Sequence, residues 1–387
     1  MQTLNILHIA TDNKFLDYAL PLFKQASAVE NTVWVINQTR HLGFTQSPVD
    51  RVISPDELPS VNASGHHAIV LHSYKDYLAD FLLKLPAGKP ILWIGWGFDY
   101  YDLIDPSAES LWLAQTRAFD RARQSQQPWL KRLVRALRAK MQRDEARLKE
   151  QAIQRINYFA PVLPIEYRVL QAARPDLSLP EQIDWNYGTL EDQYALNLGE
   201  DWVSGDHILI GNSATLTSNH LDALELIAET GLSEYQKVYI PLNYGDAHPD
   251  YTSAVCKRAQ HLLGGKSEPI TDFMPLEAYL KLLSQCGFVI MNHVRQQALG
   301  NIISMLYLGS RIFLREESPV YKDLSAYGFA LNTVQQLDSN PEHLRTPLSI
   351  EERENNRQLC RQRWGREAAL ERTQQLIATL RTAAARP

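Results

Sequence analysis

Residues 206–220 read DHILIGNSATLTSNH: a short apolar strand, a polar turn that begins with glycine, and then a helix capped near Thr217 or Ser218. In open α/β sheets, ligands bind at the carboxyl ends of strands, where small residues and helix amino termini offer backbone N–H groups to anions. Gly211, Asn212 and Ser213 are therefore candidates for binding a diphosphate. A tight strand-to-helix turn that needs only a glycine and a helix cap fits the same pattern.

The same alternation of short apolar runs and helix-length segments extends outward over most of the chain, which is typical of parallel sheets covered by helices. In the second half, the predicted strands are 206–210, 237–241, 287–291 and 311–314, and the predicted helices are 217–230, 247–263, 275–285 and 299–308. In the first half, the predicted strands are 3–10, 32–37, 67–72, 90–94 and 158–160, and the predicted helices are 15–29, 74–85, 111–153 and 164–173. The sequence therefore predicts an α/β fold.

The pattern is interrupted between residues 174 and 204, where Pro, Asp, Asn and Gly replace the apolar periodicity. We expect a domain boundary there, because 387 residues exceed the usual size of one hydrophobic core. The predicted domains are residues 1–185 and 186–348, followed by a charged helical tail over 349–387.

Composition narrows the class of protein. A net charge of −5 argues against general nucleic-acid binding, and three widely spaced cysteines suggest neither a disulfide framework nor a zinc site. The amino terminus shows no signal peptide, and no stretch reaches the roughly 20 apolar residues that span a bilayer. These features favour a folded protein of a reducing cytosol whose membrane contacts are peripheral.

Further polar residues follow the other predicted strands of the second half. Their side chains or backbone suit sugar hydroxyls and phosphate oxygens, because amides both donate and accept hydrogen bonds and guanidinium is a fork of donors. The candidates are Asn243 and Tyr244 in a turn after one strand, Arg295, Gln296 and Gln297 ahead of a helix that begins at Gly300 and Asn301, and Glu316 after the last strand. Solvated loops and a helix-dipole carboxylate are the alternative readings.

The first half carries a second group of candidates at predicted strand ends. Trp93, Trp96 and Tyr101 offer flat apolar faces for an acceptor sugar, and Asp99 could take a proton from its hydroxyl. Asp12 and His8 at the end of the first strand are further candidates for that base, and His72 for acceptor binding. Clustered aromatic residues, and single histidines or aspartates, are also common structural features.

Residues 129–143 form a basic amphipathic segment. Apolar residues at 130, 133, 134, 137 and 141 lie on one helical stripe, and six Lys or Arg residues with no acid occupy the rest. Such a helix can rest on anionic lipid through Lys131, Arg132, Arg135 and Arg138, or it can pack its stripe into its own domain.

At these residues the sequence resembles glycosyltransferase family 56, the TDP-N-acetylfucosamine:lipid II N-acetylfucosaminyltransferases. The resemblance rests on Gly211-Asn212-Ser213, on the lead-in from Glu277 to Cys286, on Arg295-Gln296-Gln297 with Gly300, on Leu308-Gly309, on Arg315-Glu316, and on Trp93 with Trp96-Gly97 and Asp99. It covers about residues 90 to 330. One departure is Ala298, where the family motif has glycine after the two glutamines.

This resemblance implies the GT-B architecture, two Rossmann-like domains facing across a cleft, with the donor nucleotide held by the carboxyl-terminal domain. It implies transfer of a 4-acetamido-4,6-dideoxyhexose from a TDP-sugar to an undecaprenyl-diphosphate-linked saccharide, by a cytoplasmic enzyme peripheral to the bacterial inner membrane. Since no Asp-x-Asp motif is present, we expect no metal cofactor, with helix termini and Arg295 stabilising the leaving diphosphate. A related transferase with another nucleotide sugar, or a non-catalytic nucleotide-sugar-binding protein, are the alternatives.

Overall fold

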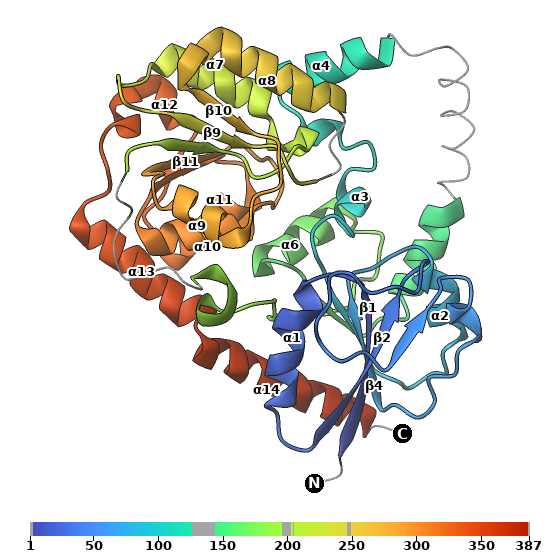
Figure 1. The fold of residues 1–387 in the computed structure, drawn as a ribbon. Helices are drawn as coiled ribbons and strands as arrows, with labels where there is room; N and C mark the ends of the chain where they lie inside the picture. The colour runs from blue at the N-terminus through green and yellow to red at the C-terminus, as the bar shows by residue number, and fades with distance from the viewer. Residues whose placement is uncertain (1–2, 126–143, 196–202, 204, 246–248, 386–387) are drawn as a thin grey trace. The chain divides into compact units, whose positions relative to one another are not determined.

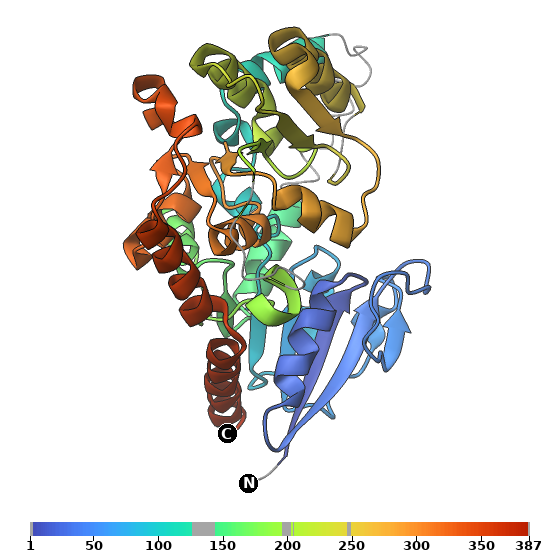
Figure 2. The ribbon, with the colours of Figure 1, turned by 60° about the vertical axis from the view of Figure 1, so that its left-hand side comes forward.

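The computed structural model describes residues 3–125, 144–195, 203, 205–245 and 249–385. The chain divides into two compact units, and each unit is formed by more than one segment of the sequence. Unit 1 comprises Met1–Pro106, Gln127–Thr189 and Arg366–Pro387, and unit 2 comprises Ser107–Gln126 and Leu190–Gly365. Figures 1 and 2 show the ribbon in two views.

Unit 1 is built on a parallel sheet whose order, within the described residues, is β3-β2-β1-β4-β5-β6-β7. Its strands are β1 (Leu4–Thr11), β2 (Val29–Ile36), β3 (Arg51–Ile53), β4 (Ala68–His72), β5 (Ile91–Ile94), β6 (Tyr158–Ala160) and β7 (Glu181–Gln182). The central strands are continuous apolar runs because helices cover both faces of a parallel sheet. The direction of connection reverses between β1 and β4, which is where ligands bind in sheets of this kind.

The helices of unit 1 bury the two faces of this sheet. They are α1 (Phe15–Lys24), α2 (Leu78–Lys84), α3 (Tyr101–Ile104), a helix over residues 144–153, α6 (Pro164–Ala173) and α14 (Arg366–Ala384). The last helix of the chain contacts both α1 and β4, and Figure 2 shows it beside α1. Its residues Leu376, Ile377 and Leu380 enter the same apolar core as Ile6 and Val70 of the sheet.

Unit 2 repeats the architecture with the strand order β10-β9-β8-β11-β12-β13 within the described residues, again all parallel. The strands are β8 (Ile208–Ile210), β9 (Val238–Pro241), β10 (Ser267–Ile270), β11 (Phe288–Met291), β12 (Arg311–Leu314) and β13 (Asn332–Thr333). The direction of connection reverses between β8 and β11, and we call this position the switch point of unit 2. The turn after residue 210 and the loop after residue 291 lie on its two sides.

The helices of unit 2 are α4 (Ala114–Ser125), α7 (His220–Thr230), α8 (Pro249–Leu263), α9 (Leu276–Leu283), α10 (Leu299–Leu308), α11 (Pro319–Tyr327), α12 (Gln336–Ser339) and α13 (Ile350–Trp364). Figure 1 shows α7 and α8 on one side of the sheet and α9 and α10 on the other. Side chains of α7 and α8, such as Leu224 and Val255, share a fully buried core with Ile208, Ile210 and Phe288 of the sheet.

Three segments lie in a different unit from the one that the predicted boundaries gave them, and the shortest is residues 186–189, which belong to unit 1. Residues 107–126 are part of unit 2, because the Asp222 carboxylate of α7 accepts hydrogen bonds from the Gln115 and Thr116 N–H groups at 2.8 and 3.0 Å and so caps the start of α4. The predicted tail 349–387 is divided between the units: α13 packs on α10, and α14 packs in unit 1.

Several predicted elements also differ in their bounds. The predicted helix 111–153 is not continuous before α4, since Leu111 ends a short 3-10 turn and Trp112 and Leu113 are not helical. Residues 126–143 of that prediction lie outside the described part of the chain. The predicted caps Thr217 and Ser218 lie in a 3-10 turn, and α7 begins only after Asn219, whose left-handed conformation (φ 49°) breaks the helix. The edge strand β10 contains Pro269, which made its sequence a poor strand candidate.

Candidate functional site

The turn after β8 starts at Gly211, which has a left-handed backbone (φ 64°). Its N–H donates to the Ile290 carbonyl at 3.0 Å and so continues the pairing of β8 with β11. A Cβ atom at this position would lie 2.6 Å from Nε2 of His220. Both the conformation and the close approach of that ring therefore require glycine.

Gln297 joins the loop after β11 to the turn after β8. Its amide nitrogen lies within hydrogen-bond distance of Asn212 Oδ1 (3.0 Å) and of the hydroxyls of Ser213, Thr215 and Ser218 (3.3, 3.1 and 3.1 Å). Its carbonyl accepts from the Thr217 hydroxyl at 2.7 Å. Gln297, which was predicted to bind the donor, therefore uses its side-chain amide for hydrogen bonds within the protein. It acts as a positioning residue for the turn after β8.

A second turn packs against the first. The Ala214 N–H donates to the Tyr244 carbonyl at 2.8 Å, and Gly245 (φ 100°) leaves room for Thr215, whose Cγ2 would lie 3.0 Å from an added Cβ atom. The Asn243 amide donates to the Asp272 carbonyl at 3.0 Å, and the Tyr244 side chain is 72% exposed. The structure therefore brings the turns after β8 and β9 together at the carboxyl edge of the sheet.

The backbone N–H groups of Asn212 and Ser213 have no protein acceptor within the described part of the chain. Across the switch point, α10 begins at Leu299, and the N–H groups of its first turn have no intrahelical partners. N–H groups without a protein acceptor and the positive end of a helix dipole both favour an anion. The arrangement is suited to phosphate oxygens.

The remaining predicted residues of this loop differ in their surroundings. Arg295 is half-buried and Gln296 is buried, and the Arg295 guanidinium lies 3.4 Å from the Gln296 carbonyl. The Asn301 amide donates to the Tyr279 hydroxyl of α9 at 2.9 Å, and Gly300 faces the Tyr194 ring. The structure thus places Arg295 beside the switch point but directs Asn301 toward α9.

Ala298 adopts the left-handed conformation (φ 62°, ψ 20°) immediately before α10. This is the residue at which the sequence departs from the glycine of the family motif. Glycine visits that region freely, whereas a residue with a Cβ atom is strained there by roughly 1 kcal/mol. The backbone path that the motif's glycine favours is therefore kept despite the alanine.

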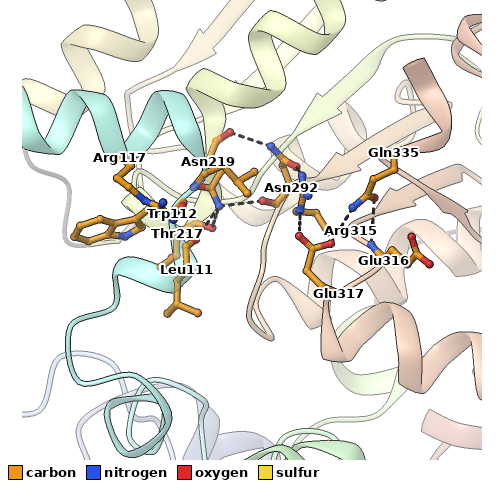
Figure 3. Close-up of polar contacts among 11 residues, drawn as sticks. Leu111, Trp112, Arg117, Thr217, Asn219, Asn292, Arg315, Glu316, Glu317 and Gln335 are labelled. Atoms are coloured by element: carbon orange, nitrogen blue, oxygen red, sulfur yellow. Dashed lines mark hydrogen bonds and ion pairs between the residues drawn. The ribbon is translucent and has the colours of Figure 1, made fainter. Parts of the chain in front are cut away.

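A polar network missed by the sequence reading connects the strand ends of unit 2 (Figure 3). The Asn219 side-chain amide donates to the backbone carbonyls of Leu111 and Asn292 at 3.0 and 3.1 Å, and its Oδ1 accepts from the Leu113 N–H at 2.9 Å. The Asn292 side chain in turn accepts from Arg315 at 3.3 Å. The only sequence signal for Asn219 as a link between segments was an asparagine just before a helix, since the residues that it contacts come from distant parts of the chain.

The network continues from Arg315 to the loop after β12. Arg315 pairs with Glu317 at 2.5 Å, and Gln335 donates to the same carboxylate at 2.8 Å. Burial raises the pKa of Glu317, but the hydrogen bonds from Arg315 and Gln335 outweigh that effect and lower it. The Glu316 side chain is exposed and lies outside these contacts (Figure 3). The carboxylate that the structure engages is therefore the neighbour of the predicted one.

Two buried histidines lie under the site. His220 and His293 are 0% and 2% exposed, and the Nε2 atom of each has no hydrogen-bond partner within the described residues. Burial lowers the pKa of His220 to about 3, and burial with the nearby Arg295 and His220 lowers the pKa of His293 far below its ordinary value. Both rings are therefore neutral at pH 7 and add no charge to the anion site.

In unit 1, Asp99 holds the carboxyl ends of β4 and β5. Its carboxylate accepts from the Tyr74 N–H (2.8 Å), the Trp93 indole (2.8 Å) and the Trp96 N–H (2.7 Å). Burial raises its pKa, and these hydrogen bonds and Lys149 partly offset the rise. The carboxylate is 4% exposed. In the structure, this predicted base positions the backbone of Tyr74 and Trp96 and the Trp93 indole.

Asp12 and His8, the other predicted bases, are also engaged by the protein. Asp12 accepts the N–H groups of Gly43, Phe44 and Thr45 at 2.8 to 3.2 Å. Burial raises the pKa of Asp12, but those hydrogen bonds together outweigh burial and lower it, so this carboxylate is a weak base. His8 is fully buried, and burial lowers its pKa to about 4 despite a hydrogen bond with Asn31.

His8 belongs to a chain of buried hydrogen bonds whose direction is fixed at one end. The Asn31 carbonyl oxygen (3.0 Å) can only accept, so His8 Nε2 carries the proton and His8 Nδ1 accepts from His72 Nε2 at 2.9 Å. His72 Nδ1 then accepts from the Tyr187 hydroxyl at 2.8 Å. His72, predicted to bind acceptor, is therefore a buried support for Tyr187.

The predicted aromatic residues divide into core and surface. Trp93 is 1% exposed, packs on Phe159 with ring centroids 4.3 Å apart, and is a core residue. Tyr101 is 6% exposed and stacks on Tyr100. Trp96 alone among the three is half-buried at the edge of the sheet. Aromatic composition could not separate these cases, because both environments favour the same residues.

The basic residues Lys131, Arg132, Arg135 and Arg138 lie outside the described residues. Among the described residues, no helix combines the length and the apolar character that a bilayer crossing requires.

Comparison with known proteins bears on the unit that carries the anion site. Residues 187–343 match the family model of the 4-alpha-L-fucosyltransferases, glycosyl transferase group 56. The matched segment contains the turns after β8 and β9, Gln297 and Arg295, and those residues of the Figure 3 network that run from Thr217 to Gln335. The resemblance seen in the sequence is confirmed, and the chain is a glycosyltransferase that transfers a hexose-type sugar.

Solved structures confirm the fold over nearly the whole chain. Sucrose-phosphate synthase from Thermosynechococcus elongatus is 11% identical, with 98% of this chain and 100% of that chain covered and a TM-score of 0.64. The alpha,alpha-trehalose 6-phosphate synthase from Burkholderia multivorans is 9% identical, with 100% and 98% covered and a TM-score of 0.61. A UDP-N-acetylglucosamine 2-epimerase is 11% identical, with 98% and 96% covered and a TM-score of 0.51. The two parallel-sheet units form the GT-B architecture.

Proposed function

We propose that this glycosyltransferase moves a 4-acetamido-4,6-dideoxyhexose from a TDP-sugar to an undecaprenyl-diphosphate-linked saccharide. The observation that carries the proposal is the link made by Gln297 across the switch point of unit 2, which holds the turn at 212–218 beside the amino terminus of α10. This site lies inside the segment that matches the 4-alpha-L-fucosyltransferase family. The donor sugar and the lipid-linked acceptor are those that the resemblance to this family implies.

In this proposal the donor diphosphate binds between the N–H groups of Asn212 and Ser213 and the first turn of α10, with Arg295 beside it. Charge develops on the departing diphosphate during transfer, and fixed donors at that position stabilise it without reorganisation. The three predicted bases are engaged elsewhere, so stabilisation of the leaving group is the contribution that we assign to this chain's own residues.

Transfer should proceed without a divalent metal, because N–H groups, a helix terminus and an arginine can neutralise the diphosphate. The experiment incubates the full chain with TDP-4-acetamido-4,6-dideoxygalactose and an undecaprenyl-diphosphate-linked saccharide in excess EDTA. Mass spectrometry should detect the acceptor extended by one sugar. Activity that vanishes in EDTA and returns with magnesium would contradict the metal-free mechanism, and transfer only from another nucleotide sugar would overturn the proposed donor.

Arg295→Ala should weaken TDP binding by about 10-fold to 100-fold, since a charge-assisted hydrogen bond contributes about 1.5–3 kcal/mol. Isothermal titration calorimetry with TDP measures the effect on the full chain. Arg345→Ala is the matched control, because Arg345 is an exposed arginine of the same unit that pairs with Glu342 away from the strand ends. An Arg295→Ala protein with unchanged TDP affinity would remove this residue from the site.

We further propose that the enzyme is peripheral to the cytoplasmic side of the inner membrane through its basic segment. Replacing Lys131, Arg132, Arg135 and Arg138 with Gln should weaken binding to liposomes that contain phosphatidylglycerol, since each nearby cation contributes about 1 kcal/mol. Flotation assays at low and high salt measure this, and TDP affinity should not change. Wild-type protein that ignores such liposomes at low salt would contradict the proposal.

A further inference from the structure

Three aromatic rings lie together at the carboxyl edge of the unit 1 sheet. Phe15 begins α1 just after β1, and Trp96 and Phe98 follow β5. The Phe15 and Trp96 rings are 4.8 Å apart and inclined by 52°, and the Trp96 and Phe98 rings are 6.0 Å apart and inclined by 77°. Since β4 lies between β1 and β5, this aromatic platform crosses the end of β4, beside the point where the chain connections reverse.

The platform is exposed although exposure of apolar rings is unfavourable. Phe15 is 38% exposed and Phe98 is 47% exposed, and Trp96 is half-buried. An apolar surface at a sheet edge that otherwise carries polar residues is characteristic of a binding site. Its polar border includes Lys75, whose ammonium group lies 4.3 Å from the centroid of the Phe98 ring.

Buried polar groups hold the platform from below. The Tyr187 ring lies 5.4 Å from Phe15 and 5.9 Å from Trp96, and its hydroxyl is fixed by the hydrogen-bond chain through His72 and His8. The backbone N–H of Trp96 donates to Asp99, which fixes the main chain that carries this ring. A surface whose supports are locked by buried hydrogen bonds loses little freedom when a ligand binds, which favours recognition of a rigid ring.

We propose that the platform of Phe15, Trp96 and Phe98 binds a pyranose ring of the acceptor saccharide. This inference rests on the proposed function, in which a saccharide is the acceptor. A pyranose has one flat face of C–H groups that matches aromatic faces, and hydroxyls at its rim that match a polar border. Because the three rings are inclined to one another, a sugar ring can stack on one exposed aromatic face and contact the edge of the next ring. The platform is too small for the helix or sheet face of a protein partner, which needs about 800 Å² on each side.

The test measures saturation-transfer NMR from the full chain to the methyl β-pyranosides of glucose, galactose, mannose and N-acetylglucosamine. Wild-type protein should saturate the C–H protons of one ring face in at least one of these sugars. Phe15→Ser and Phe98→Ser should each reduce the effect by about threefold to tenfold, because an aromatic contact contributes about 0.5–1.5 kcal/mol. Both residues are surface-exposed, so the variants should fold, as circular dichroism would verify.

Tyr327→Ser is the matched control, because Tyr327 is a similarly exposed aromatic residue (44%) of unit 2. It should leave the sugar signal unchanged, and TDP affinity should be unchanged in all three variants. Absence of saturation transfer to every pyranoside would overturn the proposal, as would a signal that survives both substitutions. Saturation of dodecanol in place of the sugars would instead show a lipid contact. If the wild-type protein did not bind TDP, the proposed donor would be wrong. The saturation-transfer result would still decide whether the platform binds a sugar.

Discussion

Acidification from about pH 7 to about pH 4.5 should lower the free energy of unfolding by several kcal/mol. Burial holds the pKa of His8 at about 4 and that of His220 at about 3, and it lowers the pKa values of His72 and His293 well below the ordinary value. These four rings stay neutral in the folded protein while the unfolded chain takes up protons below about pH 6.5. Acid therefore stabilises the unfolded state, and stability is lost as the pH falls from about 6.5 toward 4.

The contribution of His8 alone is on the order of 3 kcal/mol once the pH has fallen to about 4, because each pKa unit corresponds to about 1.4 kcal/mol. Urea denaturation at a series of pH values, followed by tryptophan fluorescence, measures the effect. His8→Gln should reduce the pH slope by about one proton. A wild-type stability that is flat between about pH 6.5 and pH 4.5 would contradict the burial of neutral histidines.

The central strands were predictable because burial on both faces leaves a clear apolar run. Residues 206–210, 287–291 and 311–314 gave β8, β11 and β12 nearly to the residue. The edge strands β10 and β13 are short and contain Pro269 or Asn332, so their conformation depends on pairing with a neighbour rather than on their own sequence. The placement of residues 107–126 in unit 2 was not predictable, since it depends on Asp222 and Asn219, more than 100 residues away.

The location of the candidate site was easier to predict than the role of each side chain. Polar residues after parallel strands indicated one edge of the sheet, and the structure brings Gly211 and Gln297 together there. Which groups remain available for a ligand depends on contacts that residue type does not specify. The polar side-chain atoms of Gln297, Asp99 and His72 all form hydrogen bonds within the protein. Phe98, which was not among the predicted site residues, is exposed and lies on the aromatic platform.

Gln297→Leu should weaken TDP binding by about 10-fold to 100-fold without touching the ligand directly. Leucine keeps the approximate volume of the side chain but removes the amide that holds Asn212, Ser213, Thr215 and Ser218 in one arrangement. The turn would then have to be ordered when the ligand binds, and each buried hydroxyl left without its partner costs about 1–3 kcal/mol. Isothermal titration calorimetry with TDP on the full chain measures the loss.

Gln236→Leu separates this effect from a general loss of stability. Gln236 is also a buried glutamine of unit 2, and its amide donates to the carbonyls of Asp206 and Leu344 at 3.0 and 2.6 Å. It precedes β9, at the edge of the sheet opposite to the strand ends that form the site. Both variants should lower the thermal unfolding temperature, but only Gln297→Leu should lower TDP affinity. Equal affinities in the two variants would show that Gln297 supports the fold alone and that the turn at 212–218 does not bind the diphosphate.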